Sequence, residues 1–143
     1  MADQGTIIQE TQPAAGVNRA RMAVLAVTVV LLGWAVPGLG HLLLRRWGRA
    51  LAFFLAVTGL AALGIFLRGN IFLPGTGDPF DTLGFLADLG AGSLYFLARL
   101  VENGGPDVSR AAGDYGTRFF ATAGVLNLLC VLDAYEIATR KKD

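Results

Sequence analysis

The chain has 143 residues, enough for one domain, and 54% of them are hydrophobic whereas only 16% are charged. A soluble fold of this size would not cover so much apolar surface, and the mean hydropathy of +0.54 agrees with that. The net charge of +1 argues against a nucleic-acid partner, because phosphate binding needs a concentrated basic face. Composition therefore predicts an all-α integral membrane protein whose first partner is the lipid bilayer.

The charged residues gather in short runs between long charge-free stretches, which is the pattern of a chain that crosses a bilayer several times. We predict about four transmembrane helices in a single membrane domain over residues 22–139. Residues 1–21 are polar and lack apolar periodicity, so we expect a flexible N-terminal tail. Residues 140–143 are expected to form a basic C-terminal tail.

The first span covers residues 22–36, or 22–44 if the chain continues through Pro37 and Gly38. A cleaved signal peptide that ends near Ala35 is the alternative, but the preceding tail is long and carries acidic residues. A proline followed by two glycines does not continue a regular helix without a kink. We therefore predict a turn between the first two spans, made by Pro37, Gly38, Gly40 and His41.

An arginine-rich stretch follows this turn. Trp47 has arginines on both sides: Arg45, Arg46 and Arg49. This combination suits the headgroup layer, where arginine binds lipid phosphates and the tryptophan ring is partly exposed to water. The second span then covers residues 50–67, about 18 residues without a charge, which at a rise of about 1.5 Å nearly cover a hydrocarbon core of about 30 Å. This segment is the clearest transmembrane prediction.

The third span, residues 83–101, contains two charged side chains, Asp88 and Arg99. An unpaired charge inside a bilayer costs at least about 2.5 kcal/mol, so we expect Asp88 to face protein or water. In one continuous helix Asp88, Gly92, Tyr95 and Arg99 would share one face.

The fourth span covers residues 119–137, with Asn127 inside it and Asp133 near its end. With four spans, each side of the membrane carries six Arg and Lys residues, so the positive-inside rule gives no orientation. The arginines after the first turn favour a cytoplasmic turn, whereas the basic C-terminal tail favours the opposite arrangement. Orientation stays open.

One motif is similar to a known family. Pro37-Gly38-Leu39-Gly40-His41-Leu42, the arginine-rich stretch and Gly48 resemble the hairpin of the two-transmembrane-helix ("TM-two") domain family of small bacterial membrane proteins. Members carry a Pro-Gly-x-Gly-(His or Gln) turn, a Tyr-Leu-Gly-like step, basic residues and a glycine that opens the second helix. The family's closing apolar helix with an aspartate looks like residues 127–135.

The chain departs from that family in two places. Leu42-Leu43-Leu44 stands where an aromatic-Leu-Gly step is expected, and the third span would be an insertion between the two halves of the motif. The resemblance implies an architecture and a location in the bacterial inner membrane. It implies no particular activity.

His41 and the arginines have several available roles. They would satisfy carbonyl groups freed by the turn, or bind headgroup phosphates. If the last helix packs beside the hairpin, Asp133 would reach the arginines, and Arg46 in particular. A haem-type ligand on the lone His41 is the less favoured alternative, since bis-histidine ligation within one chain is impossible.

No His, Asp or Glu group has the spacing of a metal site, and no nucleophile is paired with a base, so we expect neither a cofactor nor enzymatic activity. The single cysteine, Cys130, excludes a disulfide within the chain and is interpreted as a small buried hydrophobe.

Two functions stay open. The favoured one is a structural or accessory role, in which small-residue faces pack against the chain's own helices, a second copy or other membrane subunits. The alternative is an ion or proton pathway that uses Asp88, Tyr95, Arg99 and Asn127, as intramembrane ionisable residues often do. Against it, Asp88 and Arg99 lie about 16 Å apart along one helix, and four short helices leave little room for a pore.

Overall fold

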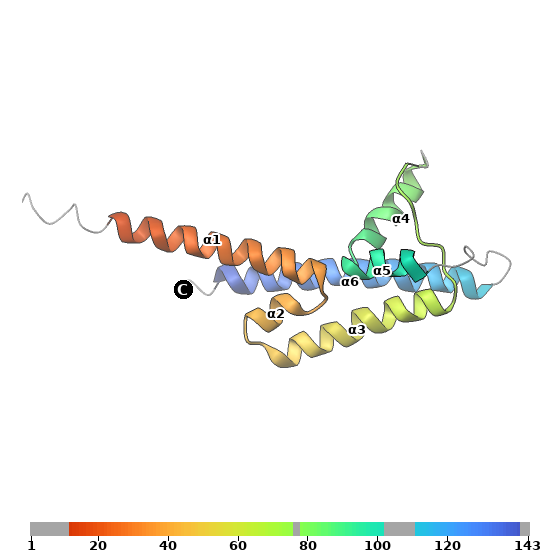
Figure 1. The fold of residues 1–143 in the computed structure, drawn as a ribbon, viewed down its shortest axis with the longest axis horizontal. Helices are drawn as coiled ribbons and strands as arrows, with labels where there is room; N and C mark the ends of the chain where they lie inside the picture. The colour runs from red at the N-terminus through yellow and green to blue at the C-terminus, as the bar shows by residue number, and fades with distance from the viewer. Residues whose placement is uncertain (1–11, 76–77, 102–110, 141–143) are drawn as a thin grey trace, which may run out of the picture.

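The computed structural model describes residues 12–75, 78–101 and 111–140, and within these ranges the chain is helical and contains no β-strand. The helices are α1 (Gln12–Ala35), α2 (Leu39–Leu43), α3 (Trp47–Phe66), α4 (Pro79–Leu89), α5 (Ser93–Val101) and α6 (Ala111–Arg140), shown in Figure 1. The prediction of an all-helical chain is confirmed.

Three helices are long and apolar enough to cross a membrane: Gly16–Ala35 within α1, Trp47–Phe66 and Ala111–Arg140. Helices satisfy their own backbone hydrogen bonds, which is why apolar segments of this length are stable in lipid. A fourth span is present only if α4 and α5 are counted as one broken or re-entrant segment, and the helix axis bends by 108° between them. The chain is thus a helical membrane protein.

The first helix begins earlier than the sequence pattern indicated. The prediction of a flexible tail is wrong for residues 12–21, because α1 begins at Gln12. Proline suits the first turn of a helix and alanine is the strongest helix former, and Pro13 is followed by two alanines. The rest of the predicted tails, residues 1–11 and 141–143, lie outside the described residues.

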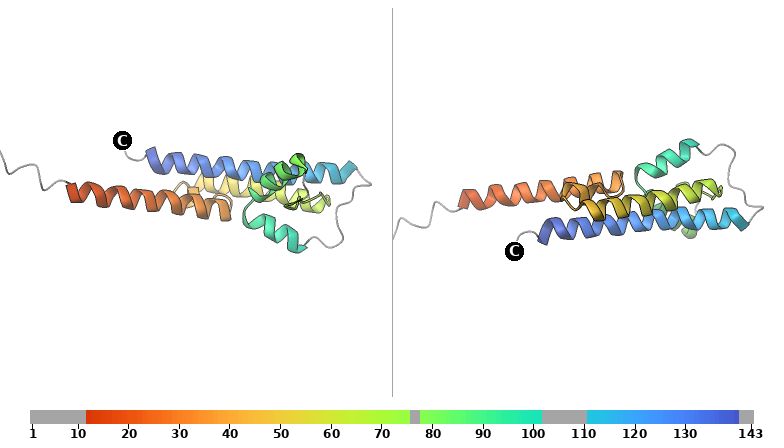
Figure 2. Two further views of the ribbon diagram at one scale, coloured as in Figure 1. Left: turned by 90° about the horizontal axis from the view of Figure 1, so that it is seen from above. Right: turned by 90° about the horizontal axis from the view of Figure 1, so that it is seen from below.

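The longest helix, α6, is the axis of the bundle and contacts α1, α2, α3 and α4. In Figures 1 and 2, α1 and α3 run in the same direction and α6 runs opposite to both. This arrangement arises because α2 has only 5 residues and returns the chain a short way before α3 starts. The first two long helices, α1 and α3, are therefore parallel and offset along the axis.

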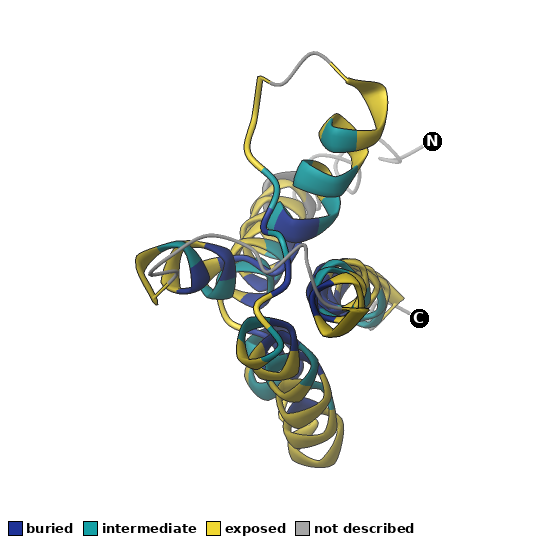
Figure 3. Cartoon of the chain, turned by 90° about the vertical axis from the view of Figure 1, so that its right-hand side faces the viewer, coloured by how far each residue is buried: buried dark blue, intermediate teal, exposed yellow. Residues whose placement is uncertain are grey.

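The core is made mainly of small side chains, and the large apolar ones point outward. Viewed along the bundle in Figure 3, the buried surfaces of the helices face one another and the exposed surfaces face away. Outward-facing side chains include Leu51, Leu55, Phe66 and Leu100, each more than half exposed. A soluble bundle would reverse this pattern, whereas lipid is an apolar solvent for such a surface. One hydrophobic core cluster comprises Val57, Ala61, Ile71, Ala91, Tyr95, Ala98, Phe120 and Ala123.

The predicted continuous third span is wrong. The helix breaks at residues 90–92, where Gly92 adopts φ 64°, a backbone conformation that other residues rarely take. A Cβ atom on Gly92 would lie 1.8 Å from the Trp34 carbonyl oxygen, so α1 approaches the break closely. The shared helical face predicted for Asp88, Tyr95 and Arg99 is lost, because Asp88 belongs to α4 and the other two to α5.

Candidate functional site

The first polar cluster lies at the hairpin between α1 and α3. Gly38 adopts φ 79°, and a Cβ atom there would lie 2.4 Å from the Ala50 carbonyl oxygen, so the residue both turns the chain and lets α3 approach. The amides of His41 and Leu42 donate to the Gly38 carbonyl at 3.1 Å. This turn starts α2 and carries the His41 side chain inward, where it is 1% exposed.

His41 and Asp133 meet across 92 residues of sequence. The His41 Nε2 group lies 2.8 Å from Asp133 Oδ2, and the Arg49 Nη1 group donates to the same oxygen at 3.1 Å. The imidazole also lies against the Phe53 ring, with centroids 4.8 Å apart. One carboxylate oxygen thus joins α2, α3 and α6, and charge-assisted hydrogen bonds of this kind are stronger than neutral ones.

The arginines predicted to pair with Asp133 behave differently from one another. Arg49 makes the contact, whereas Arg45 and Arg46 are exposed and the structure does not bring Arg46 to Asp133. Arg46 and Asp133 instead line one polar cavity of about 550 Å³. Its other lining residues are Leu44, Arg49, Glu136, Ile137 and Arg140.

The second polar cluster lies at the break between α4 and α5. Asp88 is fully buried, and its Oδ2 accepts a hydrogen bond of 2.9 Å from the Phe72 amide. The Tyr95 hydroxyl donates to the carbonyl of the same Phe72 at 3.2 Å. Two side chains from separate helices therefore hold one residue of the α3–α4 connection by both its backbone groups.

A third contact ties this break to the rest of the bundle. The Asn127 amide donates to the Gly90 carbonyl at 2.9 Å and to the Trp34 carbonyl at 3.1 Å, and the Trp34 indole donates to the Leu89 carbonyl at 3.1 Å. These carbonyls lie where helices end, so they lack the usual partners four residues on. Asn127 thus caps two helix ends at once.

The residues predicted for a polar path are therefore divided among separate contacts. Asp88 and Tyr95 share Phe72, Asn127 serves the helix ends, and Arg99 lies half-buried on α5. Sequence reasoning missed Phe72 and the hydrogen bond of Trp34, and nothing in the local pattern marks a backbone group as a partner. The pairing of His41 with Asp133 had one signal, since both are polar residues in apolar surroundings.

Some buried oxygens have no hydrogen-bond partner among the described residues: Thr58 Oγ1, Asp88 Oδ1 and Asn127 Oδ1. In the same part of the chain, no three His, Cys, Asp or Glu side chains are arranged to hold a metal ion. The lone cysteine, Cys130, is buried.

The comparisons with known proteins give one match. Neither a curated protein nor a solved structure matches the chain. The profile of DUF6677, described as a family of unknown function, matches residues 28–143, which include the hairpin, the α4–α5 break and α6. Because this match covers most of the sequence, the chain belongs to the DUF6677 family.

Proposed function

We propose that the chain is a small multi-pass membrane protein with a structural or accessory role, which packs beside another membrane subunit or a second copy through the N-terminal half of α1. A location in the bacterial inner membrane, without catalytic activity, is part of the proposal. It rests on the fit between the hairpin and the TM-two pattern, and on the uncovered surface of α1.

The uncovered half of α1 is the observation that carries the proposal. α1 lies antiparallel to α6, with Gly33 beside Val131. Counting along both helices at the same rise, about residue 24 of α1 is level with Arg140, where α6 ends. The earlier turns of α1 extend past the other helices in Figure 2. Val17, in those turns, is 53% exposed, and Val24 and Val27, beside the last turn of α6, are 66% and 57% exposed.

Lipid alone does not account for this surface. The 20 residues of α3 match a hydrocarbon core of about 30 Å, and the arginines at its start suit the headgroup level. Arg49 is level with Asp133, so with the bilayer placed on α3 the part of α1 before about residue 31 lies beyond those arginines, although Gly16–Ala35 is by itself long and apolar enough to span a membrane. Apolar side chains in that part of α1 are removed from water only if another protein surface covers them.

Site-specific photocrosslinking in intact membranes tests the proposal. A photoreactive residue at position 24 or 27 should give one protein adduct of constant mass, which identifies either a second copy or another subunit. Matched controls are positions 63 and 66 on α3, whose side chains are also exposed and apolar, and which should give lipid adducts alone. Lipid adducts alone from positions 24 and 27 would refute the proposal.

A second candidate, a small ion or proton pathway, is favoured by one observation. Asp88 and Asn127 are fully buried, and each has an oxygen without a hydrogen-bond partner among the described residues. Unpaired polar atoms in a membrane interior often mark ion sites. Proteoliposomes tested for proton and cation flux decide between the candidates. A flux that is abolished by Asp88→Asn, while the variant stays folded, supports the pathway. The absence of any flux would refute this second candidate.

A further inference from the structure

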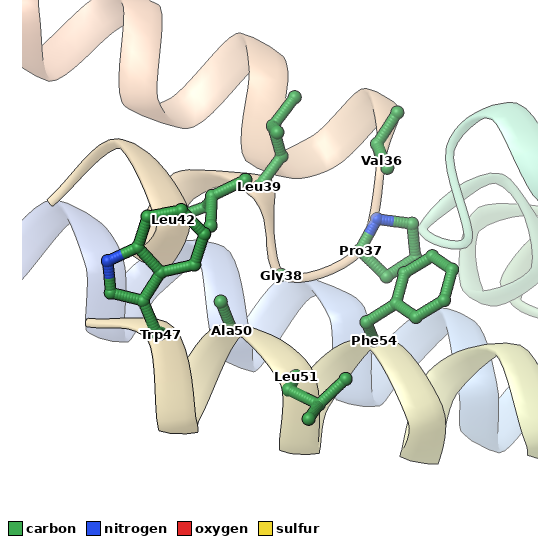
Figure 4. Close-up of a pocket in the computed structure, with 9 residues that line it drawn as sticks. All are labelled: Val36, Pro37, Gly38, Leu39, Leu42, Trp47, Ala50, Leu51 and Phe54. Carbon is green, nitrogen blue, oxygen red and sulfur yellow. The ribbon is translucent and has the colours of Figure 1, made fainter. Parts of the chain in front are cut away.

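An apolar groove runs along the outside of the hairpin. It has a volume of about 410 Å³, within the range of about 300–1,000 Å³ of small-molecule sites, and only apolar residue types and Gly38 line it. Figure 4 shows Trp47 and Leu42 at one end and Pro37 and Phe54 at the other. From Trp47 to Phe54 the groove follows α3 for about 10 Å.

The groove opens toward the lipid side of the bundle. Trp47 is 68% exposed, and Leu51 and Phe54 are exposed as well. These side chains belong to a helix that is apolar enough to cross a membrane, so hydrocarbon is the solvent that reaches the groove. An occupant must therefore be apolar over this length.

Positive charge lies at the Trp47 end of the groove. Arg45 and Arg46 directly precede Trp47 and both are exposed; neither lines the groove itself, and Arg46 also lines the neighbouring polar cavity with Asp133. Neither guanidinium has a hydrogen bond or ion pair within the described parts of the chain, whereas Arg49 is held by Asp133. Arg45 also adopts φ 60°, a left-handed conformation that is costly for a residue with a side chain. Two cations that have no partner among the described residues therefore lie close to the end of an apolar groove.

We propose that this groove holds an acyl chain of one anionic phospholipid, whose phosphate is bound by Arg45 and Arg46. An apolar tail and a negative headgroup are the two features that the groove and the arginines complement together. Free phosphate would satisfy the arginines alone, and a neutral lipid would satisfy the groove alone. The proposal is independent of any protein partner of α1.

Quenching of tryptophan fluorescence tests the site directly, because bromine atoms on an acyl chain quench an indole that they touch. The Trp34→Phe variant leaves Trp47 as reporter, and Trp47→Phe leaves Trp34, which does not line the groove. Each variant is reconstituted in phosphatidylcholine vesicles with rising fractions of brominated phosphatidylglycerol or brominated phosphatidylcholine. At Trp47 we expect the anionic lipid to associate about fivefold more strongly than the neutral one.

The arginine variants locate the headgroup. In the Trp34→Phe background, Arg45→Gln with Arg46→Gln should reduce the ratio of anionic to neutral lipid association to about one. Arg118→Gln, on α6 near the end of α3 that is farther from Trp47, should leave this ratio unchanged. Added inorganic phosphate should not release the lipid. Equal association of both lipids at Trp47, an undiminished ratio in the double variant, or the same ratio at Trp34 would each overturn the proposal. If Trp34→Phe does not fold, the ratio is measured in the unmodified chain and must disappear in Trp47→Phe.

Discussion

The two polar regions of this small bundle are built on different principles. At the hairpin, His41 and Arg49 share the carboxylate of Asp133, and the cluster lies next to exposed arginines. At the α4–α5 break, Asp88 and Asn127 are fully buried and bind backbone groups rather than opposite charges. Near headgroups and water, at the hairpin, the polar side chains pair with opposite charges. In the buried interior, at the α4–α5 break, they pair with backbone amides and carbonyls instead.

The largest expected effect comes from a substitution that disrupts the packing of the α4–α5 break against α6. A Cβ atom on Gly124 would lie 1.8 Å from the Ala87 carbonyl oxygen, so Gly124→Val cannot be accommodated while α4 stays packed on α6. We expect a loss of more than about 3 kcal/mol in the free energy of unfolding. Circular dichroism during titration with a denaturing detergent measures it. Gly59→Val is the matched control, because no atom lies within 4 Å of its new Cβ.

The next effect tests whether backbone capping holds the break. Asn127→Leu leaves the carbonyls of Trp34 and Gly90 without this donor, and should cost about 2 kcal/mol of unfolding free energy in the same titration. Thr122→Val on the same helix removes a hydroxyl bonded only to its own helix, and should change stability by less than about 0.5 kcal/mol. Equal losses in the two variants would show that Asn127 is not a special contact.

A double-mutant cycle tests the charge principle at the hairpin. Asp133→Asn and His41→Leu remove two groups that touch at 2.8 Å, so their losses should be non-additive by about 1.5 kcal/mol. Asp133→Asn combined with Arg46→Gln should instead be additive to within about 0.5 kcal/mol, because those side chains do not form an ion pair. Coupling to Arg46 as strong as that to His41 would contradict the structure.

The smallest effect refines the description of the break. Tyr95→Phe removes the hydrogen bond to the Phe72 carbonyl and keeps the ring, so we expect a loss of about 1 kcal/mol. Tyr135→Phe, on an exposed position of α6, is the control and should be neutral within about 0.5 kcal/mol. No difference between the two variants would mean that the hydroxyl of Tyr95 contributes nothing to holding Phe72.

Apolar runs in the sequence predict the helices well where the backbone stays helical over the whole run. The predicted span 50–67 agrees with α3 to within a few residues at its start and one at its end, and residues 119–137 lie within α6. The third segment fails because its hydropathy is continuous while its backbone is not. Gly90-Ala91-Gly92 is the local signal for a break, but the positive φ of Gly92 and the close approach of the Trp34 carbonyl depend on how α1 packs there.

The sequence indicated which polar residues would form the clusters, but it indicated less well which groups they would contact. Asp133 was expected to meet arginines, and one of three, Arg49, reaches it. Its contact with His41 depends on how α2 turns inward, which spacing does not specify. Asp88 was expected to face protein or water, and its partner is a main-chain amide that almost any residue at position 72 would provide. Only proline would remove that donor, so side-chain patterns carry no information about it.

The parallel course of α1 and α3 has a consequence for mapping topology. A scheme that changes sides at every apolar segment assigns the start of α1 and the end of α3 to the same compartment, because two segments separate them. In this chain those two points lie at opposite ends of the bundle, since α2 returns the chain by only 5 residues. Enzymatic reporters fused before residue 16 and after residue 66 should therefore report opposite compartments, against simple alternation.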